Sequence, residues 1–204
     1  MLKQFAGFGI LATLSFPICS FAQQPASPNE PSRAPAATHA TSTTDASLAT
    51  LSDLIEQRLA LMEEVSKAKW NNGSSIEDPE REQKVLQDVQ AEARQIDLPS
   101  QWVQHFFRLQ IEAAKLVQYQ LFSQWRSSDQ TRFSKTMDLN SQIRPQLDQI
   151  TAAILAALKS NWPAVKAEPI RSFEHPPLHK SGRFPEAEHL ALTPLFDGSA
   201  QSMP

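Results

Sequence analysis

Residues 57–70 read QRLALMEEVSKAKW, a stretch that is typical of a helix with one apolar face. With the residues just before it, helical spacing gathers a stripe of apolar side chains on one side: Leu51, Leu54, Ile55, Met62 and Val65. Arg58 falls in the middle of this stripe, and Lys69 returns to it three turns later. The stretch therefore predicts a helix that directs two cations toward its own core, where an unpaired charge is costly.

The chain starts with a segment that has the layout of a secretory signal peptide. In residues 1–22 one lysine precedes an apolar run that ends in small residues at positions 20 and 22. We predict cleavage after Ala22, which removes Lys3 and the single cysteine, Cys19, and changes the formal net charge from −3 to −4. A lipid anchor on Cys19 is the less favoured alternative, because Ile18 is larger than a lipidation site usually tolerates.

These features indicate an exported protein, either periplasmic or secreted, with no stable membrane association once the signal is removed. The apolar run is too short for a confident membrane span. Without a cysteine the mature chain cannot form an internal disulfide, so packing alone must stabilise it. A mildly acidic chain is also a poor candidate for a nucleic-acid partner, which requires a basic face.

The rest of the chain divides into three parts. Residues 23–47 are rich in Pro, Ala, Ser and Thr and nearly lack large apolar side chains, which predicts a disordered linker. Residues 48–160 show helical periodicity and are predicted to form the domain. Residues 161–204 are rich in proline, so we expect a weakly structured or divergent tail with one short helix near residues 186–192.

The domain is predicted to be an all-α helical bundle, because no strand-like alternation of any length appears in it. The four expected helices cover residues 48–71, 79–95, 99–126 and 140–159. Asp78 followed by Pro79 is a favourable start for the second of them. Pro145 must either start the fourth helix or kink it.

Each expected helix directs a polar group at, or close to, the interior. Besides Arg58 and Lys69, the set holds Asp78, Arg81, Glu82, Gln118 and Arg144. In the ordinary interpretation these groups pair with each other, for example Arg58 with Glu82, while Gln118 bonds a backbone group. However, four cations face one or two carboxylates, and an uncompensated cationic cluster inside a bundle costs several kcal/mol. A small ligand with two carboxylates would supply the missing charge.

Three segments carry a resemblance to a known family: RLALMEEVSKAKW, IEDPERE and FFRLQIEAAKLVQYQLFSQW. They resemble the all-helical, AroQ-class chorismate mutases, and the signal peptide and the helices after Trp125 are similar to the secreted, gamma subclass. The resemblance covers roughly residues 51–158 and rests on the spacing from arginine to lysine to D-x-x-R-E to glutamine. It implies an isomerase that converts chorismate to prephenate with no metal or cofactor.

The resemblance also implies roles for the polar residues. Arg58 and Arg81 match arginines that hold the substrate carboxylates. Lys69 matches a lysine that contacts a carboxylate and the ether oxygen of the breaking bond, and Gln118 matches the second group that bonds this oxygen. The catalytic residues implied are therefore Lys69, Gln118 and Arg58.

Three further residues complete the implied substrate site. Glu82 matches a position that holds the substrate hydroxyl in some members, and Asp78 helps through its backbone. Arg144 matches the arginine by which secreted members complete the site within one chain, whereas shorter members take it from a partner subunit. A homodimer is compatible with the family, although the residues themselves do not indicate one.

Two departures from the family pattern keep alternatives open. Ala114 stands where many members have a polar residue, so a hydrogen bond to the substrate carboxylate worth roughly 0.5–1.5 kcal/mol is lost and weaker binding is expected. The proline-rich tail does not resemble the further helices of secreted members. The alternatives are an enzyme similar to isochorismate pyruvate lyase on the same scaffold, and an exported helical binding protein without catalysis.

Overall fold

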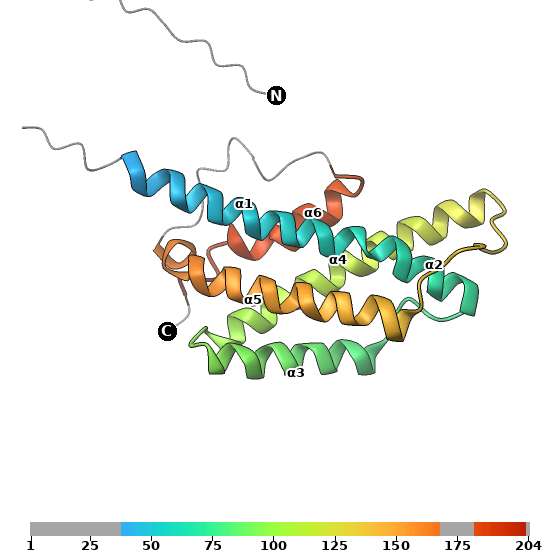
Figure 1. Ribbon diagram of the computed structural model, residues 1–204, viewed down its shortest axis with the longest axis horizontal. Coiled ribbons are helices and arrows are strands. Elements are labelled where there is room, and N and C mark those ends of the chain that lie inside the picture. Colours follow the sequence, from blue (N-terminus) through green and yellow to red (C-terminus); the bar gives the residue numbers. More distant parts are fainter. Residues whose placement is uncertain (1–37, 168–181, 203–204) are drawn as a thin grey trace, which may run out of the picture. The chain divides into compact units, whose positions relative to one another are not determined.

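The computed structural model describes residues 38–167 and 182–202, and for residues 38–47 the backbone alone. The described residues lie in one compact unit and form helices joined by short connections, with no strand among them, so the all-α prediction is confirmed (Figure 1). None of the helices described is long and apolar enough to cross a membrane. The predicted signal peptide and most of the predicted linker fall outside the described residues.

The first predicted helix is observed as two consecutive helices, α1 (Thr38–Ala60) and α2 (Met62–Asn72). Backbone hydrogen bonds continue across the junction, since the amide of Leu61 donates to Gln57 and its carbonyl accepts from Val65. Gly73 ends α2 in the left-handed region, with φ 64°, where glycine costs least. The predicted apolar stripe is buried except for Leu54, which is half-buried, and Arg58 and Lys69 are buried with it.

Helix α1 begins at Thr38, inside the predicted linker, so the linker assignment differs from the structure over residues 38–47. The last proline before this stretch is Pro35, and neither proline nor glycine interrupts the sequence from there to Leu48. Once Leu48 and Leu51 are anchored in the core, extending the helix backwards adds one hydrogen bond for each residue fixed. Composition alone does not reveal such an extension.

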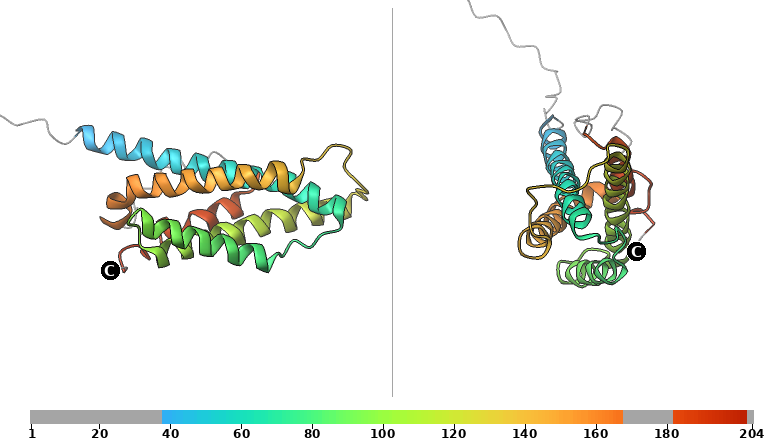
Figure 2. Two further views of the ribbon diagram at one scale, coloured as in Figure 1. Left: turned by 60° about the horizontal axis from the view of Figure 1, so that its bottom comes forward. Right: turned by 90° about the vertical axis from the view of Figure 1, so that its right-hand side faces the viewer.

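The second and third predicted helices match α3 (Pro79–Gln95) and α4 (Ser100–Ser127) closely. Asp78 caps α3, because its Oδ1 accepts a hydrogen bond of 3.2 Å from the amide of Arg81. Helix α3 packs against α4, and the long buried face of α4 forms the centre of the domain. Figure 2 shows α3 and α4 side by side beneath α1 and α5.

The fourth predicted helix begins with a π-helical turn, Leu139–Ile143, and continues as α5 (Arg144–Ala167), which packs against α1. Pro145 is the second residue of α5, so it lies in the first turn of α5 and not in its interior. Pro163 lies inside α5, and the helix continues eight residues beyond its expected end at 159. Packing offsets the hydrogen bond that Pro163 cannot donate, because Val165 is fully buried and the Trp162 ring lies 4.8 Å from that of Trp102.

The short helix expected near residues 186–192 is confirmed, whereas the expectation of a weakly structured tail does not hold for residues 182–202. They form α6 (Pro185–Leu192) and a 3₁₀ turn, Thr193–Leu195, and α6 packs against α4 and α1. Its apolar face is buried, and Trp102 Nε1 donates a 3.0 Å hydrogen bond to Ser199 in the segment that follows. A helix of eight residues is too short to be stable by itself, so this one depends on the surface that α4 offers.

Candidate active site

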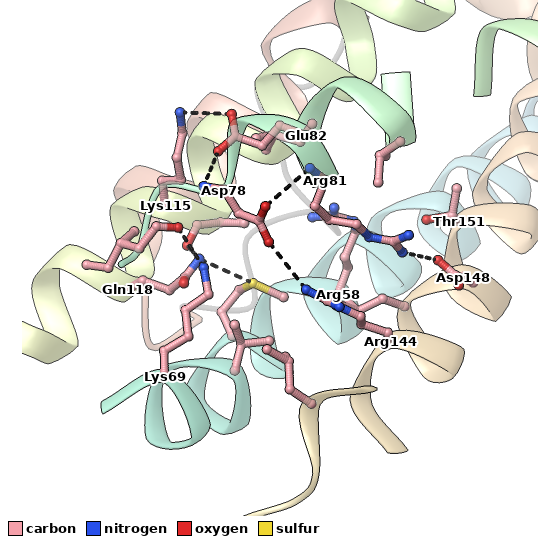
Figure 3. Close-up of a pocket in the computed structure, with 18 residues that line it drawn as sticks. Arg58, Lys69, Asp78, Arg81, Glu82, Lys115, Gln118, Arg144, Asp148 and Thr151 are labelled. Carbon is pink, nitrogen blue, oxygen red and sulfur yellow. Dashed lines mark hydrogen bonds and ion pairs between the residues drawn. The ribbon is translucent and has the colours of Figure 1, made fainter. Parts of the chain in front are cut away.

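A cavity of about 120 Å³ that opens to solvent lies among helices α1 to α5 (Figure 3). The structure brings all seven predicted polar residues to its wall: Arg58, Lys69, Asp78, Arg81, Glu82, Gln118 and Arg144. The remaining polar lining consists of Lys115, Asp148 and Thr151, which the sequence did not indicate. Apolar side chains from the same helices complete the wall, among them Met62, Val65 and Ile111.

Arg58 extends from α1 to the wall of this cavity and is only 6% exposed. Its Nη1 donates a 3.2 Å hydrogen bond to the carbonyl oxygen of Gln110, while its Nε is buried without a partner. Burial lowers the pKa of Arg58 to about 10. Among the described residues no carboxylate pairs with it, so the pairing with Glu82 expected in the ordinary interpretation is absent.

Lys69 extends from α2 and is also buried, at 8% exposure. Its Nζ donates a short hydrogen bond of 2.6 Å to the carbonyl oxygen of Ile76, which leaves two N–H donors for other groups. Burial lowers the pKa of Lys69; Asp78 and Glu82 oppose this effect, and the positive charge of Arg144 adds to it. Within the described part of the chain Lys69 forms no ion pair, so it resembles Arg58 in facing the cavity uncompensated.

Arg81 and Arg144 also line the cavity and are more exposed than Arg58. Each of them forms an ion pair with an aspartate that links α3 to α5. Arg81 Nη2 on α3 lies 2.8 Å from Asp148 Oδ1 on α5, and Arg144 Nη2 on α5 lies 3.3 Å from Asp78 Oδ2 at the start of α3. Arg144 Nη1 also donates to Asn140 Oδ1 at 2.5 Å. All these groups are partly exposed, and such ion pairs contribute at most about 1 kcal/mol, so both guanidinium groups can exchange partners with a ligand.

Glu82 is held in place by two donors. Its Oε1 accepts a 3.3 Å hydrogen bond from the amide of Asp78, and its Oε2 lies 3.4 Å from Lys115 Nζ. Lys115 also pairs with Glu112 at 2.9 Å and with Glu77 at 3.1 Å. Burial alone would lower the pKa of Lys115, but these carboxylates outweigh it and raise that pKa. Lys115 is therefore neutralised locally and contributes little free positive charge to the cavity.

Gln118 lies on the buried face of α4 and is 4% exposed. Its Nε2 donates a 3.0 Å hydrogen bond to the carbonyl oxygen of Ala114 and lies 4.0 Å from Met62 Sδ. Its Oε1 is buried and has no partner, which leaves the amide short of one hydrogen bond. The side chain of Ala114 offers no hydrogen bond to the cavity, in agreement with the departure noted in the sequence.

Lys115 and Asp148 were not predicted from the sequence, although both lie close to positions noted there. Lys115 follows Ala114, and Asp148 lies one turn after Arg144. A charged residue one turn from a site arginine on the same helix face was a usable signal for Asp148. The position of Lys115 depends on carboxylates from two other segments, which sequence spacing does not bring together.

The charges around the cavity define what it can bind. Five cations and three carboxylates line it, which leaves an excess of two positive charges. The two cations without a carboxylate partner in the described structure, Arg58 and Lys69, are also the two most buried. Fold and site thus define the class of protein: an all-helical bundle whose cavity is lined by an excess of positive charge.

Comparison with known proteins gives the family. Residues 44–119 match the profile of the family described as Chorismate mutase type II. The secreted chorismate mutase of Mycolicibacterium smegmatis is 31% identical over 127 residues, which are 62% of this chain and 70% of that protein. The secreted chorismate mutase of Mycobacterium tuberculosis is 28% identical over 120 residues, 59% of this chain and 60% of that protein.

A solved structure matches this chain over nearly its own whole length. The crystal structure of chorismate mutase from Burkholderia thailandensis superposes with a TM-score of 0.64 at 32% identity, covering 74% of this chain and 99% of that one. The chain therefore belongs to the chorismate mutase type II family, a family of isomerases. Several relatives are named secreted chorismate mutases, which supports export.

Proposed function

We propose that the cavity binds chorismate and rearranges it to prephenate, and that neither metal nor cofactor takes part. The observation that carries this proposal is the pair of buried cations without carboxylate partners, Arg58 and Lys69, beside the buried amide of Gln118. Chorismate carries two carboxylates, which would compensate the excess of two positive charges on the cavity wall. Binding a dianion here also offsets the cost of burying the two cations.

The reaction needs a shape and a charge environment rather than a chemical group from the protein. The rearrangement is pericyclic, so one C–O bond breaks while a C–C bond forms, and the enzyme forms no covalent bond to the substrate. The substrate must be held in a compact conformation, for which the planar forks of Arg58, Arg81 and Arg144 are suited. These arginines extend from three different helices, α1, α3 and α5, and all three line the cavity (Figure 3).

Lys69 and Gln118 are the proposed donors to the ether oxygen. This oxygen gains negative charge as the C–O bond breaks, so donors aimed at it stabilise the transition state more than the ground state. For Gln118 this role requires an N–H of its amide to turn toward the cavity, where its unpartnered oxygen shows that the present arrangement is not saturated. Glu82 keeps lone pairs for the substrate hydroxyl, and Asp78 holds the start of α3.

The experiment that tests the proposal identifies the product formed by residues 23–204 from chorismate, with no metal or cofactor added. We expect prephenate from the wild type and a fall of at least about tenfold in kcat/KM for Arg81→Ala, because one charge-assisted contact to a carboxylate is lost. Arg94→Ala is the matched control, since Arg94 lies on the same helix but is exposed and outside the cavity.

The same experiment, repeated with isochorismate as substrate, decides between the proposed reaction and its alternatives. Release of pyruvate from either substrate would assign an activity similar to that of isochorismate pyruvate lyase. A folded, helical chain that leaves both substrates unchanged would instead be a binding protein. Equal losses in Arg81→Ala and Arg94→Ala would show that the effect of Arg81 is not local to the cavity.

The side chain of Gln118 predicts how activity depends on pH. An amide donates a hydrogen bond at any pH, whereas a carboxyl group donates only when it is protonated. We expect wild-type activity to persist through neutral and mildly alkaline pH. In Gln118→Glu the rate should fall by about tenfold per pH unit above the pKa of the new carboxyl group, because only its protonated form can donate.

The check is a pair of pH–rate profiles for the wild type and Gln118→Glu. Gln124→Glu, an exposed position on the same helix, controls for the added negative charge. A profile for Gln118→Glu that is as flat as that of the wild type would remove Gln118 from its proposed role.

Location and assembly follow from the same proposal. We infer that the mature chain acts in the periplasm or outside the cell, in line with its secreted relatives. All seven proposed site residues come from one chain, since α5 supplies Arg144. A homodimer is therefore not required for activity, and a monomer isolated by size exclusion should be active.

A further inference from the structure

The connection between α4 and α5 is fastened to the end of α2 by one side chain. Asn71 Nδ2 donates a 2.9 Å hydrogen bond to the carbonyl oxygen of Phe133, and Asn71 Oδ1 accepts one of 2.9 Å from the amide of the same residue. The next residue back, Trp70, donates from Nε1 to the carbonyl oxygen of Thr131 at 3.2 Å. Two consecutive residues of α2 thus bind the backbone of a segment sixty residues away.

An aromatic cluster seats the same connection against the bundle. The Phe133 ring lies 4.6 Å from that of Trp125, which in turn lies 5.6 Å from the ring of Trp70. Phe122 completes the cluster, with its ring 5.1 Å from that of Trp70. Edge-to-face contacts of this kind stabilise aromatic pairs beyond the effect of the area that they bury. The position of Phe133 is therefore set by contacts in several directions.

The fastened connection leads directly into the proposed active site. Asp138 ends it and caps the following turn, because its Oδ1 accepts hydrogen bonds from the amides of Asn140 and Ser141. Leu139 then lines the cavity, and Arg144, the first residue of α5, follows eleven residues after Phe133. At this end of α5 the contacts with α3 are the partly exposed ion pairs described above, which join these two helices only weakly, although α5 also packs against α1.

We propose that Asn71 is a positioning residue for Arg144. On α2, Lys69 enters the cavity while Asn71, two residues later, holds the connection that delivers Arg144 to the same cavity. Lys69 and Asn71 lie on the same helix, α2. The two hydrogen bonds between Asn71 and Phe133, here called the clamp, therefore fix Arg144 of α5 relative to Lys69. This inference rests on the proposed function of the cavity. It adds that Asn71 places Arg144, so that a single chain supplies the complete site.

The kinetic test compares Asn71→Ala with Asn72→Ala. Asn72 is the adjacent residue of the same type, but it is exposed and forms no hydrogen bond through its side chain in the described structure. We expect Asn71→Ala to raise KM for chorismate about tenfold with a smaller change in kcat, since both hydrogen bonds that are lost lie away from the reacting atoms. Asn72→Ala should behave as the wild type.

The double variant shows whether the effect passes through Arg144. If it does, Asn71→Ala should raise KM less than about twofold when Arg144 has already been replaced by alanine, because the two changes remove the same contact. A full tenfold rise in that background would overturn the proposal, as would an Asn71→Ala variant that matches the wild type.

A measurement without substrate separates this inference from the proposed function. Amide hydrogen exchange in residues 131–143 should become faster in Asn71→Ala and stay at the wild-type rate in Asn72→Ala, with α4 unchanged in both. Unchanged exchange in Asn71→Ala would overturn the clamp even if the enzyme is active. A wild type that does not convert chorismate would contradict the proposed function. The exchange comparison would still show whether Asn71 holds residues 131–143 in place.

Discussion

Replacing Arg58 with methionine is expected to lower kcat/KM for chorismate by about 30- to 5,000-fold. The guanidinium is buried and has no carboxylate partner among the described residues, so a substrate carboxylate in contact with it would be fully desolvated. Removing one partner of such a buried charge pair costs about 2–5 kcal/mol, which corresponds to that range of rates. Methionine keeps most of the side-chain volume and removes the charge.

The same replacement should leave the free energy of unfolding equal to, or higher than, that of the wild type. Burial lowers the pKa of Arg58 to about 10 from its usual 12.5, which corresponds to a cost on the order of 3 kcal/mol for keeping it charged at neutral pH. A methionine at this position avoids that cost, and its thioether packs well against Met62 and Val65. Lost activity with retained stability is the pattern expected of a residue that serves a ligand.

Steady-state kinetics on Arg58→Met measures the expected loss of kcat/KM, and urea unfolding measures the free energy of unfolding. Arg108→Met is the control, since Arg108 is an exposed arginine of α4 outside the cavity. A variant that is clearly less stable but still active would mean that Arg58 serves the fold, and that its bond to Gln110 is its main purpose.

Replacing Lys69 with methionine is expected to lower kcat by about 100- to 1,000-fold, the usual cost of removing one donor from a developing oxyanion. Lys69 has two N–H donors left after its bond to Ile76, and Gln118 cannot replace their positive charge. Lys67→Met is the matched control, because Lys67 lies on the same helix and pairs outside the cavity with Glu63 and Glu64. A loss of the same size in both variants would contradict a specific role for Lys69.

The lowered pKa of Lys69 sets the alkaline limit of the wild-type enzyme. Only the ammonium form can donate to the ether oxygen with its full charge, so kcat/KM should fall at a pH below 10.5, the usual pKa of lysine. Arg58, with a pKa of about 10, adds to this decline. A bound dianion favours the charged forms, so the decline of kcat should lie at higher pH than that of kcat/KM.

Stability should change in the opposite direction over this range. Because the pKa of Lys69 in the folded chain lies below that of the unfolded chain, the unfolded chain binds more protons between the two values. The contribution of Lys69 to stability therefore rises with pH through that window. Circular dichroism at each pH separates the two effects, and unfolding that coincides with the loss of activity would contradict a titration in the site.

Helices and site residues could be predicted from the sequence where the signal lies within one helix. Asp78 and Pro79 placed the start of α3, and the stripe of α4 was read from its apolar spacing. Arg58 and Gln118 could be selected because each interrupts an apolar stripe, and the structure places both on the wall of one cavity. Such residues are visible in sequence because a buried polar group is the exception that periodicity exposes.

Other features depended on surfaces that no single segment contains. The short helix α6 was expected near residues 186–192, but its stability depends on packing against α4 and α1, because eight residues are too few for an isolated helix. Pro163 reads as a break in sequence but lies inside α5, because Trp162 and Val165 pack around it. The pairing of Arg81 with Asp148 joins residues 67 positions apart, a distance over which spacing carries no information.

The sequence by itself thus determined the helical class, the family resemblance and the polar residues that face the interior. Each of these follows from periodicity within one helix or from a spacing kept along the chain. Only the tertiary structure decided that Arg58 and Lys69 lack carboxylate partners among the described residues, that Lys115 is neutralised, and that Asn71 holds the connection leading to Arg144. These depend on distances between side chains of different helices, which are fixed by packing and not by the order of residues.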